Sequence, residues 1–128
     1  MAQRIFSGVP SEAIAGYAKA VIDGSTIYVS GTTGRDKTTG IFPTDAAQQA
    51  RNALAEIDDV LKKAGASLAH AVASRVYVTD LEAADAVTPV LGEVFKDIRP
   101  TSTFLICQIP ARGAKVEIEI IASVSVVE

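Results

Sequence analysis

The apolar residues of this chain follow two spacings, and the clearer of them is helical. Beyond Thr44 and Asp45, either of which is a fair N-cap, small and aliphatic side chains recur every three or four positions. These positions are Ala50, Ala53, Leu54, Ile57, Leu61 and Ala64. Gly65 then suits the C′ position, where a left-handed backbone ends a helix. The pattern predicts one long helix.

A second helix is predicted over residues 82–96. Asp80 can cap this helix, and its apolar positions lie on one face. They are Val87, Val90, Leu91, Val94 and Phe95. Pro89 falls inside this span and lacks the backbone N–H that a helix interior uses. We therefore expect either a kink there or a restart of the helix with Pro89 at its first position.

The other apolar segments are short and rich in β-branched residues, a pattern typical of strands. We predict six strands, at residues 3–8, 17–22, 26–30, 71–79, 102–109 and 115–127. Asp23 and Gly24 separate the second strand from the third and favour a tight hairpin turn. Residues 31–42 are polar and punctuated by glycine, which predicts a loop.

Alternation along two of these strands predicts which side chains are buried. In residues 71–79 we expect Val72, Val76 and Val78 on one side, with Arg75 and Tyr77 on the other. In residues 115–127 every second residue is apolar, beginning at position 116. The intervening residues there include aliphatic ones as well as polar ones: Glu117, Glu119, Ile121, Ser123, Ser125 and Val127.

Two helices and six strands in a chain of 128 residues predict a single α+β domain, spanning residues 1–128. Both helices are expected on one face of a six-stranded mixed sheet. The other face then still carries apolar side chains. A small domain with two partly apolar sheet faces tends to associate with copies of itself, although the periodicity does not give the number of copies.

Charge and composition exclude several classes of partner. The chain has a formal net charge of −3 and no run of Lys or Arg, so nucleic acid is not expected to bind. No stretch approaches the roughly 18 apolar residues that span a membrane, and the N-terminus does not resemble a signal peptide. A single cysteine, Cys107, fits a reducing compartment. We therefore expect a cytoplasmic domain without a membrane partner.

Cofactor motifs are not found either. One histidine, His70, and one cysteine do not make up a set of metal ligands. There is no glycine-rich phosphate loop and no dinucleotide-binding fingerprint. We expect a protein that works without a metal or a cofactor.

Five short motifs occur in a particular order along the chain. They are Gly16-Tyr17, Val29-Ser30-Gly31, Ala64-Gly65-Ala66-Ser67-Leu68, Val76-Tyr77-Val78-Thr79-Asp80 and Val116-Glu117-Ile118-Glu119. Each is weak alone, but in this order and spacing they resemble the Rid (reactive intermediate deaminase, YjgF-like) family. The resemblance implies a chorismate-mutase-like fold. It also implies a homotrimer that hydrolyses imines and enamines to a carbonyl compound and ammonia in clefts between subunits.

The resemblance also implies roles for individual residues. Glu117 matches the glutamate that orients the attacking water, and a carboxylate suits this role because it accepts a proton from water. Tyr17 matches a tyrosine that packs against the substrate. Ser30 and Gly31 match a pocket-forming pair in which glycine lets the backbone approach a ligand, and Thr32 can add a hydroxyl donor. The alternative for Glu117 is a place on a solvated polar face.

One position departs from the family pattern. Active deaminases of this family carry Pro-x-Arg, whose guanidinium binds the substrate carboxylate through two parallel N–H donors. Here Pro100 is followed by Ser102 at the arginine position. We expect an altered substrate range, unless Arg99 or Arg75 supplies the missing cation. The alternatives are that Ser102 is an ordinary strand residue, that Arg99 is a surface charge, and that Arg75 pairs with Glu117 or Glu119 across the sheet.

Two classes of function follow from these residues. The first is a cofactor-independent enzyme acting on an imine or enamine. The second is a non-catalytic trimer that binds a small metabolite such as a keto acid, or a protein partner, in the same clefts. Relatives have also been labelled ribonucleases, a label to which the acidic composition gives no physical support.

Overall fold

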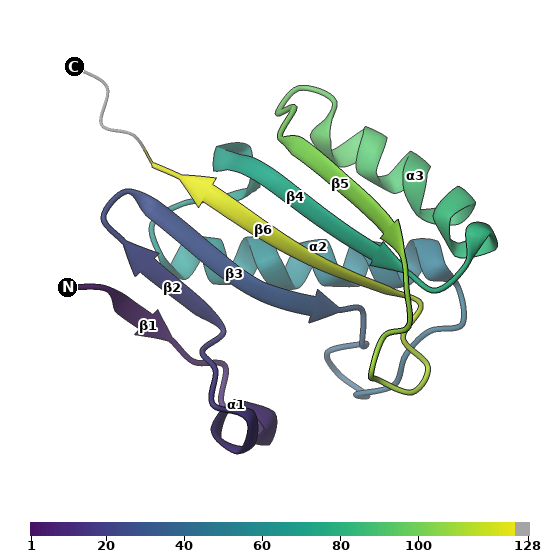
Figure 1. The fold of residues 1–128 in the computed structure, drawn as a ribbon, viewed down its shortest axis with the longest axis horizontal. Helices are drawn as coiled ribbons and strands as arrows, with labels where there is room; N and C mark the ends of the chain where they lie inside the picture. The colour runs from purple at the N-terminus through teal and green to yellow at the C-terminus, as the bar shows by residue number, and fades with distance from the viewer. Residues whose placement is uncertain (125–128) are drawn as a thin grey trace.

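Six strands form one mixed sheet in the computed structural model, which describes residues 1–124 (Figure 1). The strands are β1 (Gln3–Ile5), β2 (Ala20–Asp23), β3 (Thr26–Thr33), β4 (Ala71–Val78), β5 (Thr101–Ile106) and β6 (Val116–Ser123). They lie in the order β1-β2-β3-β6-β4-β5. Only β4 and β5 are parallel, and the other neighbours are antiparallel. The predicted α+β class with a six-stranded mixed sheet is confirmed.

Two long helices cover one face of this sheet (Figure 1). Helix α2 (Ala46–Lys63) begins after Asp45, whose carboxylate accepts a hydrogen bond from the Ala47 N–H at 3.0 Å. Helix α3 (Leu81–Phe95) begins after Asp80, which accepts from the Ala83 N–H at 2.7 Å. Both caps were predicted. Helix α3 continues through Pro89, so the alternative of a restart at that residue is wrong.

The hydrophobic core lies between the helices and the sheet. Alternate residues of β6 are buried against it, as the period of two predicted: Val116, Ile118, Ile120 and Ala122. Ile57 and Leu61 of α2 are fully buried on the other side of this layer. Only the first part of the predicted strand 115–127 can be compared, because residues 125–128 lie outside the described part of the chain.

The N-terminal segment differs from the prediction. Strands at 3–8 and 17–22 were expected, but β1 and β2 are shorter and a helix, α1 (Pro10–Ala15), lies between them. The carboxylate of Glu12 holds this segment, accepting hydrogen bonds from the N–H groups of Ser7 and Gly8 and from the Ser7 hydroxyl. Gly16, with φ of 75°, then ends the helix. Tyr17 therefore lies in a loop and not in a strand.

A β-bulge changes the predicted alternation in β4. The register between β4 and β6 shifts between Ala71 and Ala73, so one residue is added to the strand. As a result Ala71 is buried and Val72 is 48% exposed, whereas Ser74 keeps the buried side that it shares with Val76, with 5% exposure. The prediction that Val72 shares a side with Val76 is wrong for this reason.

The other sheet face is open and faces the viewer in Figure 1. Arg75 lies on this face, where its Nη1 is 3.6 Å from Oε2 of Glu119. The Tyr77 hydroxyl donates to Oε1 of the same carboxylate at 2.6 Å. The predicted ion pair of Arg75 with a glutamate of the last strand is thus confirmed. Large apolar side chains are exposed on this face, among them Tyr28 and Leu105, whereas the exposed Ile106 pairs with buried Val78 and lies on the helix side of β5.

No helix among residues 1–124 has the length and apolar character that crossing a membrane requires. Within the same residues there is no group of three or more His, Cys, Asp and Glu side chains that could hold a metal ion.

Candidate active site

A pocket of about 820 Å³ opens where β3 ends beside the N-terminal segment. Its wall includes five of the residues singled out from the sequence: Tyr17, Ser30, Gly31, Thr32 and Glu117. They come from three separate parts of the chain. The register between β3 and β6 shifts between Val29 and Thr32, and this irregularity places the Ser30–Thr32 backbone at the pocket. The fold therefore brings together the residues that the motifs indicated.

The carboxylate of Glu117 lies directly on Gly31. A Cβ atom added to Gly31 would collide with Oε2 of Glu117, so only glycine leaves room for the carboxylate in this position. Burial raises the pKa of Glu117, and the neighbouring charge of Glu119 raises it further, whereas Lys19 opposes both effects. A carboxyl group with a raised pKa accepts and returns protons closer to neutral pH.

Hydroxyl groups in the pocket are mostly engaged with the protein. The Ser30 hydroxyl donates to the Ala18 carbonyl at 2.6 Å, and the Tyr17 hydroxyl lies 2.6 Å from the Ser11 Oγ. The Thr32 hydroxyl donates to the Ser30 carbonyl at 2.9 Å. Ser30 and Thr32 therefore hold the bulge and the Tyr17 loop in place, and Tyr17 presents its ring to the pocket.

Sequence reasoning missed four charged residues of this pocket, Glu12, Lys19, Arg35 and Glu56, two of which form a partly buried contact. Lys19 is 7% exposed, and its Nζ donates to Oε2 of Glu56 at 2.6 Å and to Oγ1 of Thr32 at 2.7 Å. Glu56 belongs to α2, 37 positions further along the chain. The one available signal was a lysine inside an otherwise apolar segment before β2. Nothing in the sequence pattern connects that lysine to Glu56.

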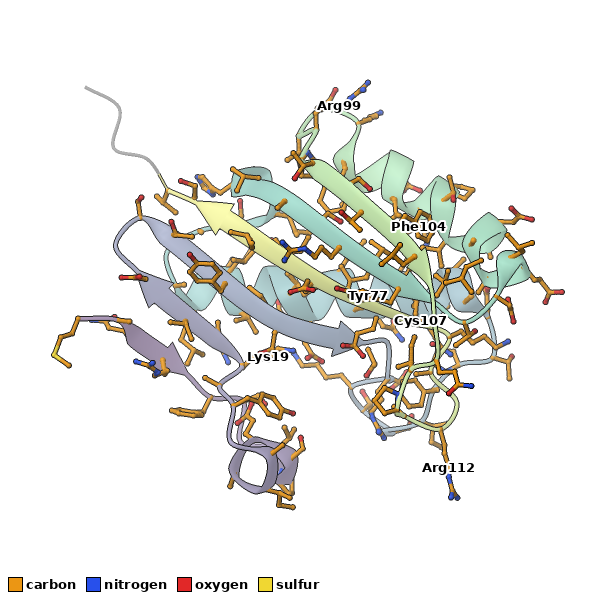
Figure 2. All side chains as sticks on the ribbon, viewed as in Figure 1. Lys19, Tyr77, Arg99, Phe104, Cys107 and Arg112 are labelled. Atoms are coloured by element: carbon orange, nitrogen blue, oxygen red, sulfur yellow. The ribbon has the colours of Figure 1, made fainter. Side chains whose placement is uncertain are left out.

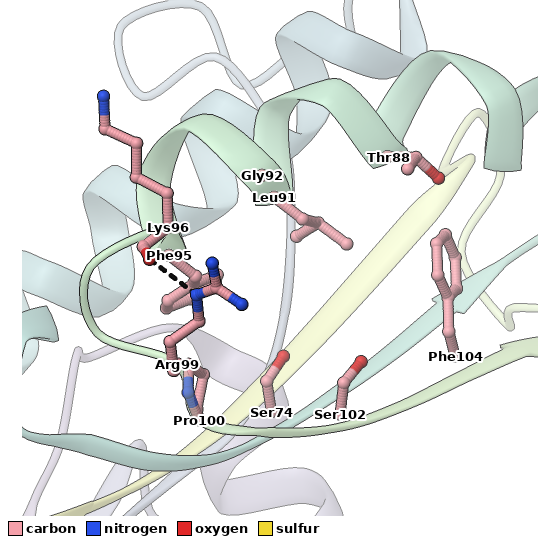
Figure 3. A pocket seen from close by; sticks show the side chains of 10 residues that line it. All are labelled: Ser74, Thr88, Leu91, Gly92, Phe95, Lys96, Arg99, Pro100, Ser102 and Phe104. Atoms are coloured by element: carbon pink, nitrogen blue, oxygen red, sulfur yellow. Dashed lines mark hydrogen bonds between the residues drawn. The ribbon is translucent and has the colours of Figure 1, made fainter.

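Arg99 and Ser102 lie in a different pocket, of about 540 Å³, between α3 and the strands β4 and β5 (Figure 3). Arg99 follows α3 with a φ of 57°, and its Nε donates to the Lys96 carbonyl at 2.6 Å. The side chains of Ser74 and Ser102 point into this pocket from paired positions on β4 and β5. Neither hydroxyl has a hydrogen-bond partner within residues 1–124.

One chain does not unite all the predicted site residues. Ser102 is on the edge strand β5 and faces α3, whereas Gly31 is on β3, with two strands in between. At about 4.8 Å per strand spacing, β3 and β5 are roughly 14 Å apart. Arg75 borders neither pocket, because it lies on the open sheet face beside Glu119. Figure 2 shows Arg99 at the upper edge of the molecule and Lys19 well below it, near the start of β2.

Comparison with known proteins places this architecture in a family. A family profile described as Endoribonuclease L-PSP matches residues 9–124. The 2-iminobutanoate/2-iminopropanoate deaminase of Capra hircus is 33% identical over 125 residues, which are 95% of this chain and 90% of the relative. The RutC family protein UK114 of Drosophila melanogaster is 38% identical over 117 residues, covering 90% of this chain and 84% of the relative.

Solved structures agree with these sequence relatives. A member of the YjgF/YER057c/UK114 family from Mycobacterium tuberculosis superposes with a TM-score of 0.86 at 37% identity, covering 97% of this chain and 100% of that chain. A Rid-family protein from Yersinia pestis superposes with a TM-score of 0.84 at 29% identity, covering 97% of this chain and 100% of that one. The chain belongs to the endoribonuclease L-PSP (YjgF/Rid) family, which confirms the resemblance seen in its motifs.

Proposed function

We propose that this protein hydrolyses reactive imines and enamines to a carbonyl compound and ammonia without a cofactor. The observation that carries the proposal is the Glu117 carboxylate, which lies on Gly31 in a pocket beside the Tyr17 ring. Relatives named 2-iminobutanoate/2-iminopropanoate deaminase, at 30–34% identity, support the same reaction. Of the two classes of function, catalysis is favoured because burial gives Glu117 a raised pKa.

The chemistry needs one group that moves protons. Glu117 accepts a proton from water while the water oxygen forms a bond to the imine carbon and the C=N electron pair moves to nitrogen. Glu117 then returns the proton to that nitrogen, which gives a carbinolamine. Glu117 next takes the hydroxyl proton of the carbinolamine and passes it to the nitrogen, so that the C–N bond breaks, ammonia leaves and the carbonyl forms. An enamine enters the same route after protonation at carbon. The Tyr17 ring holds the substrate, and the backbone of Ser30 and Gly31 contacts it.

We further propose that the working unit is a homotrimer, in which the Arg99 pocket of one copy completes the Glu117 pocket of the next. The separation of the two pockets in one chain and the exposed Tyr28, Leu105 and Ile106 side chains support self-association. Analytical ultracentrifugation is expected to give three chains per particle. A folded monomer at micromolar concentration would contradict the shared cleft.

In this cleft Arg99 binds the acidic group of a substrate, helped by the hydroxyl of Ser102. Arg99 uses only its Nε within the described residues, so its outer N–H groups are free for a ligand. Arg75 is the weaker candidate because its ion pair with Glu119 already occupies it. The exposed, unpaired Cys107 fits the reducing cytoplasm in which we propose that the protein acts.

The proposal is tested by generating imines enzymatically in the assay mixture. An amino-acid oxidase is run on a panel of amino acids, and ammonia release is followed with and without the protein. We expect faster release with the protein for at least one amino acid. Unchanged release with every amino acid would reject the enzyme, and binding of keto acids measured by calorimetry would then favour the non-catalytic trimer.

Gly31→Ala is expected to lower kcat by up to about 100-fold, since a displacement of about 1 Å in a catalytic group has such effects. The added methyl group collides with the end of the Glu117 side chain, which must swing out of place. Stability should change little because that side-chain end is free to move. The measurement is kcat together with urea unfolding. A variant with full activity would show that the contact between Gly31 and Glu117 has no catalytic role.

Ser102→Arg is expected to raise kcat/KM for carboxylate-bearing imines by at least about tenfold, because hydrogen bonds to a charged group contribute about 1.5–3 kcal/mol. Ser102→Lys adds the same charge without the fork of parallel donors, so its gain should be smaller. Imines without a carboxylate serve as control substrates and should be unaffected. No gain with the arginine variant would mean that Ser102 does not limit binding of the acidic group.

A further inference from the structure

Lys19 is buried at a junction of three elements. It precedes β2, and its ammonium contacts Thr32 in β3 and Glu56 in α2. The side chain of Lys19 is 8% exposed, whereas that of Glu56 is 36% exposed. Moving the Lys19 ammonium out of water is costly, and the partly exposed Glu56 repays little of this cost because water screens its charge. The pair therefore calls for an explanation other than stability.

The position of Lys19 provides such an explanation, since Lys19 lines the same pocket as Glu117. The charged and titratable groups that line this pocket or neighbour Glu117 on its own and the adjacent strand are Glu12, Tyr17, Lys19, Arg35, Glu56, Tyr77, Arg75, Lys115 and Glu119. Most of them are engaged elsewhere. Glu12 holds Ser7 and Gly8, and Glu119 binds Tyr77 and Arg75.

The other cations beside Glu117 contact partners elsewhere in the protein. The guanidinium of Arg35 lies over the Phe42 ring, 4.6 Å from its centroid, and donates to the Gly40 carbonyl at 3.3 Å. The Lys115 ammonium donates to the Thr44 carbonyl at 2.6 Å. Lys19 is thus the cation, among residues 1–124, that acts on the Glu117 carboxylate from inside the pocket.

We propose that Lys19 is a positioning residue, whose ammonium is fixed between Glu56 and Thr32 and holds Glu117 in its proton-accepting form. Glu56, on α2, weakens the electrostatic effect of Lys19 on Glu117, because its negative charge offsets the positive charge of the ammonium. The proposal rests on the proposed function of Glu117, but the interaction of charges that it describes exists whether or not imines are the substrate. The effect of Lys19 on the pKa of Glu117 has the direction that this role requires.

Two variants, which should shift the pH dependence of kcat in opposite directions, test the role of Lys19. Lys19→Met removes the positive charge while keeping most of the volume, and should move the acidic limb of the kcat profile to higher pH by on the order of one unit. Glu56→Gln removes the counter-charge and should move the limb to lower pH. Lys19→Arg keeps the positive charge, so the acidic limb should stay at its wild-type pH. The control is Lys37→Met, which removes a lysine from an exposed ion pair with Asp59 outside this pocket.

A second readout separates this proposal from the reaction itself. Carbon-13 NMR of the glutamate side-chain carboxyls, with the Glu117 signal identified by its loss in Glu117→Gln, should show the same two shifts in the titration of Glu117. If the wild type hydrolyses no imine but these shifts occur, the proposed function fails and the role of Lys19 stands. If the Glu117 titration is unmoved in both variants, the role of Lys19 is rejected. Should Lys19→Met fail to fold, the shift in Glu56→Gln decides.

Discussion

Replacing Glu117 by Gln should reduce kcat by about 10²–10⁴-fold, the usual contribution of general acid–base catalysis, with a small change in KM. The amide occupies the same place on Gly31 but cannot take a proton from water. Coupled ammonia release with an amino-acid oxidase measures the effect. The matched control is Glu119→Gln on the same strand, which removes a carboxylate that binds Tyr77 and Arg75 and does not line the pocket.

The Glu117→Gln variant should also be slightly more stable than the wild type at neutral pH. Burial raises the pKa of Glu117 in the folded state above its unfolded value, so ionisation of this group weakens folding as pH rises through the folded pKa. Below the unfolded pKa the carboxyl is neutral in both states, and the two proteins should unfold alike. Thermal unfolding at neutral and acidic pH gives the comparison. Equal or lower stability of the variant at neutral pH would contradict the buried setting of Glu117.

Gln49→Leu is the second large expected effect, and it concerns stability. Gln49 is fully buried in α2. Its Nε2 donates to the carbonyls of Pro43 and Gly113 at 2.7 and 2.9 Å, and its Oε1 accepts from the Lys115 N–H at 2.8 Å. Leucine keeps most of the volume but leaves three backbone groups without a partner. At about 1–3 kcal/mol for each, the free energy of unfolding should fall by at least about 3 kcal/mol.

Urea unfolding of Gln49→Leu measures this loss of unfolding free energy, and Gln48→Leu serves as the control. Gln48 is the exposed neighbour, and its amide donates to Oδ1 of Asn52 at 2.9 Å. The Gln48 variant should therefore lose well under 1 kcal/mol. A loss of similar size in both variants would show that the loop before β6 does not depend on Gln49.

The helices and strands that depend only on the periodic spacing of apolar residues could be predicted from the sequence. The spacing of small and aliphatic residues gave α2, and strict alternation gave β6 with its buried side. Elements fixed by one specific interaction could not. Helix α1 depends on the Glu12 carboxylate binding Ser7 and Gly8, and the side on which Val72 lies depends on a bulge at the β4–β6 pairing. Neither interaction leaves a repeating pattern in the sequence.

The same distinction applies to the candidate site: residues in sequence motifs could be predicted, whereas residues joined only by tertiary contacts could not. Tyr17, Gly31 and Glu117 could be predicted because they lie in motifs that retain their order, and the fold brings them to one pocket. The contact between Lys19 and Glu56 joins two elements through tertiary packing, so no local pattern indicates it. The placing of Arg99 and Ser102 in a second pocket likewise depends on the edge position of β5.

A crystal structure with a bound keto acid, the product of the proposed reaction, tests the central claim most directly. We expect the keto carbon beside the Glu117 carboxylate and the Tyr17 ring, with the acid group reaching Arg99 of a neighbouring copy around a threefold axis. A keto acid bound away from Glu117, or bound wholly within one chain, would contradict the account.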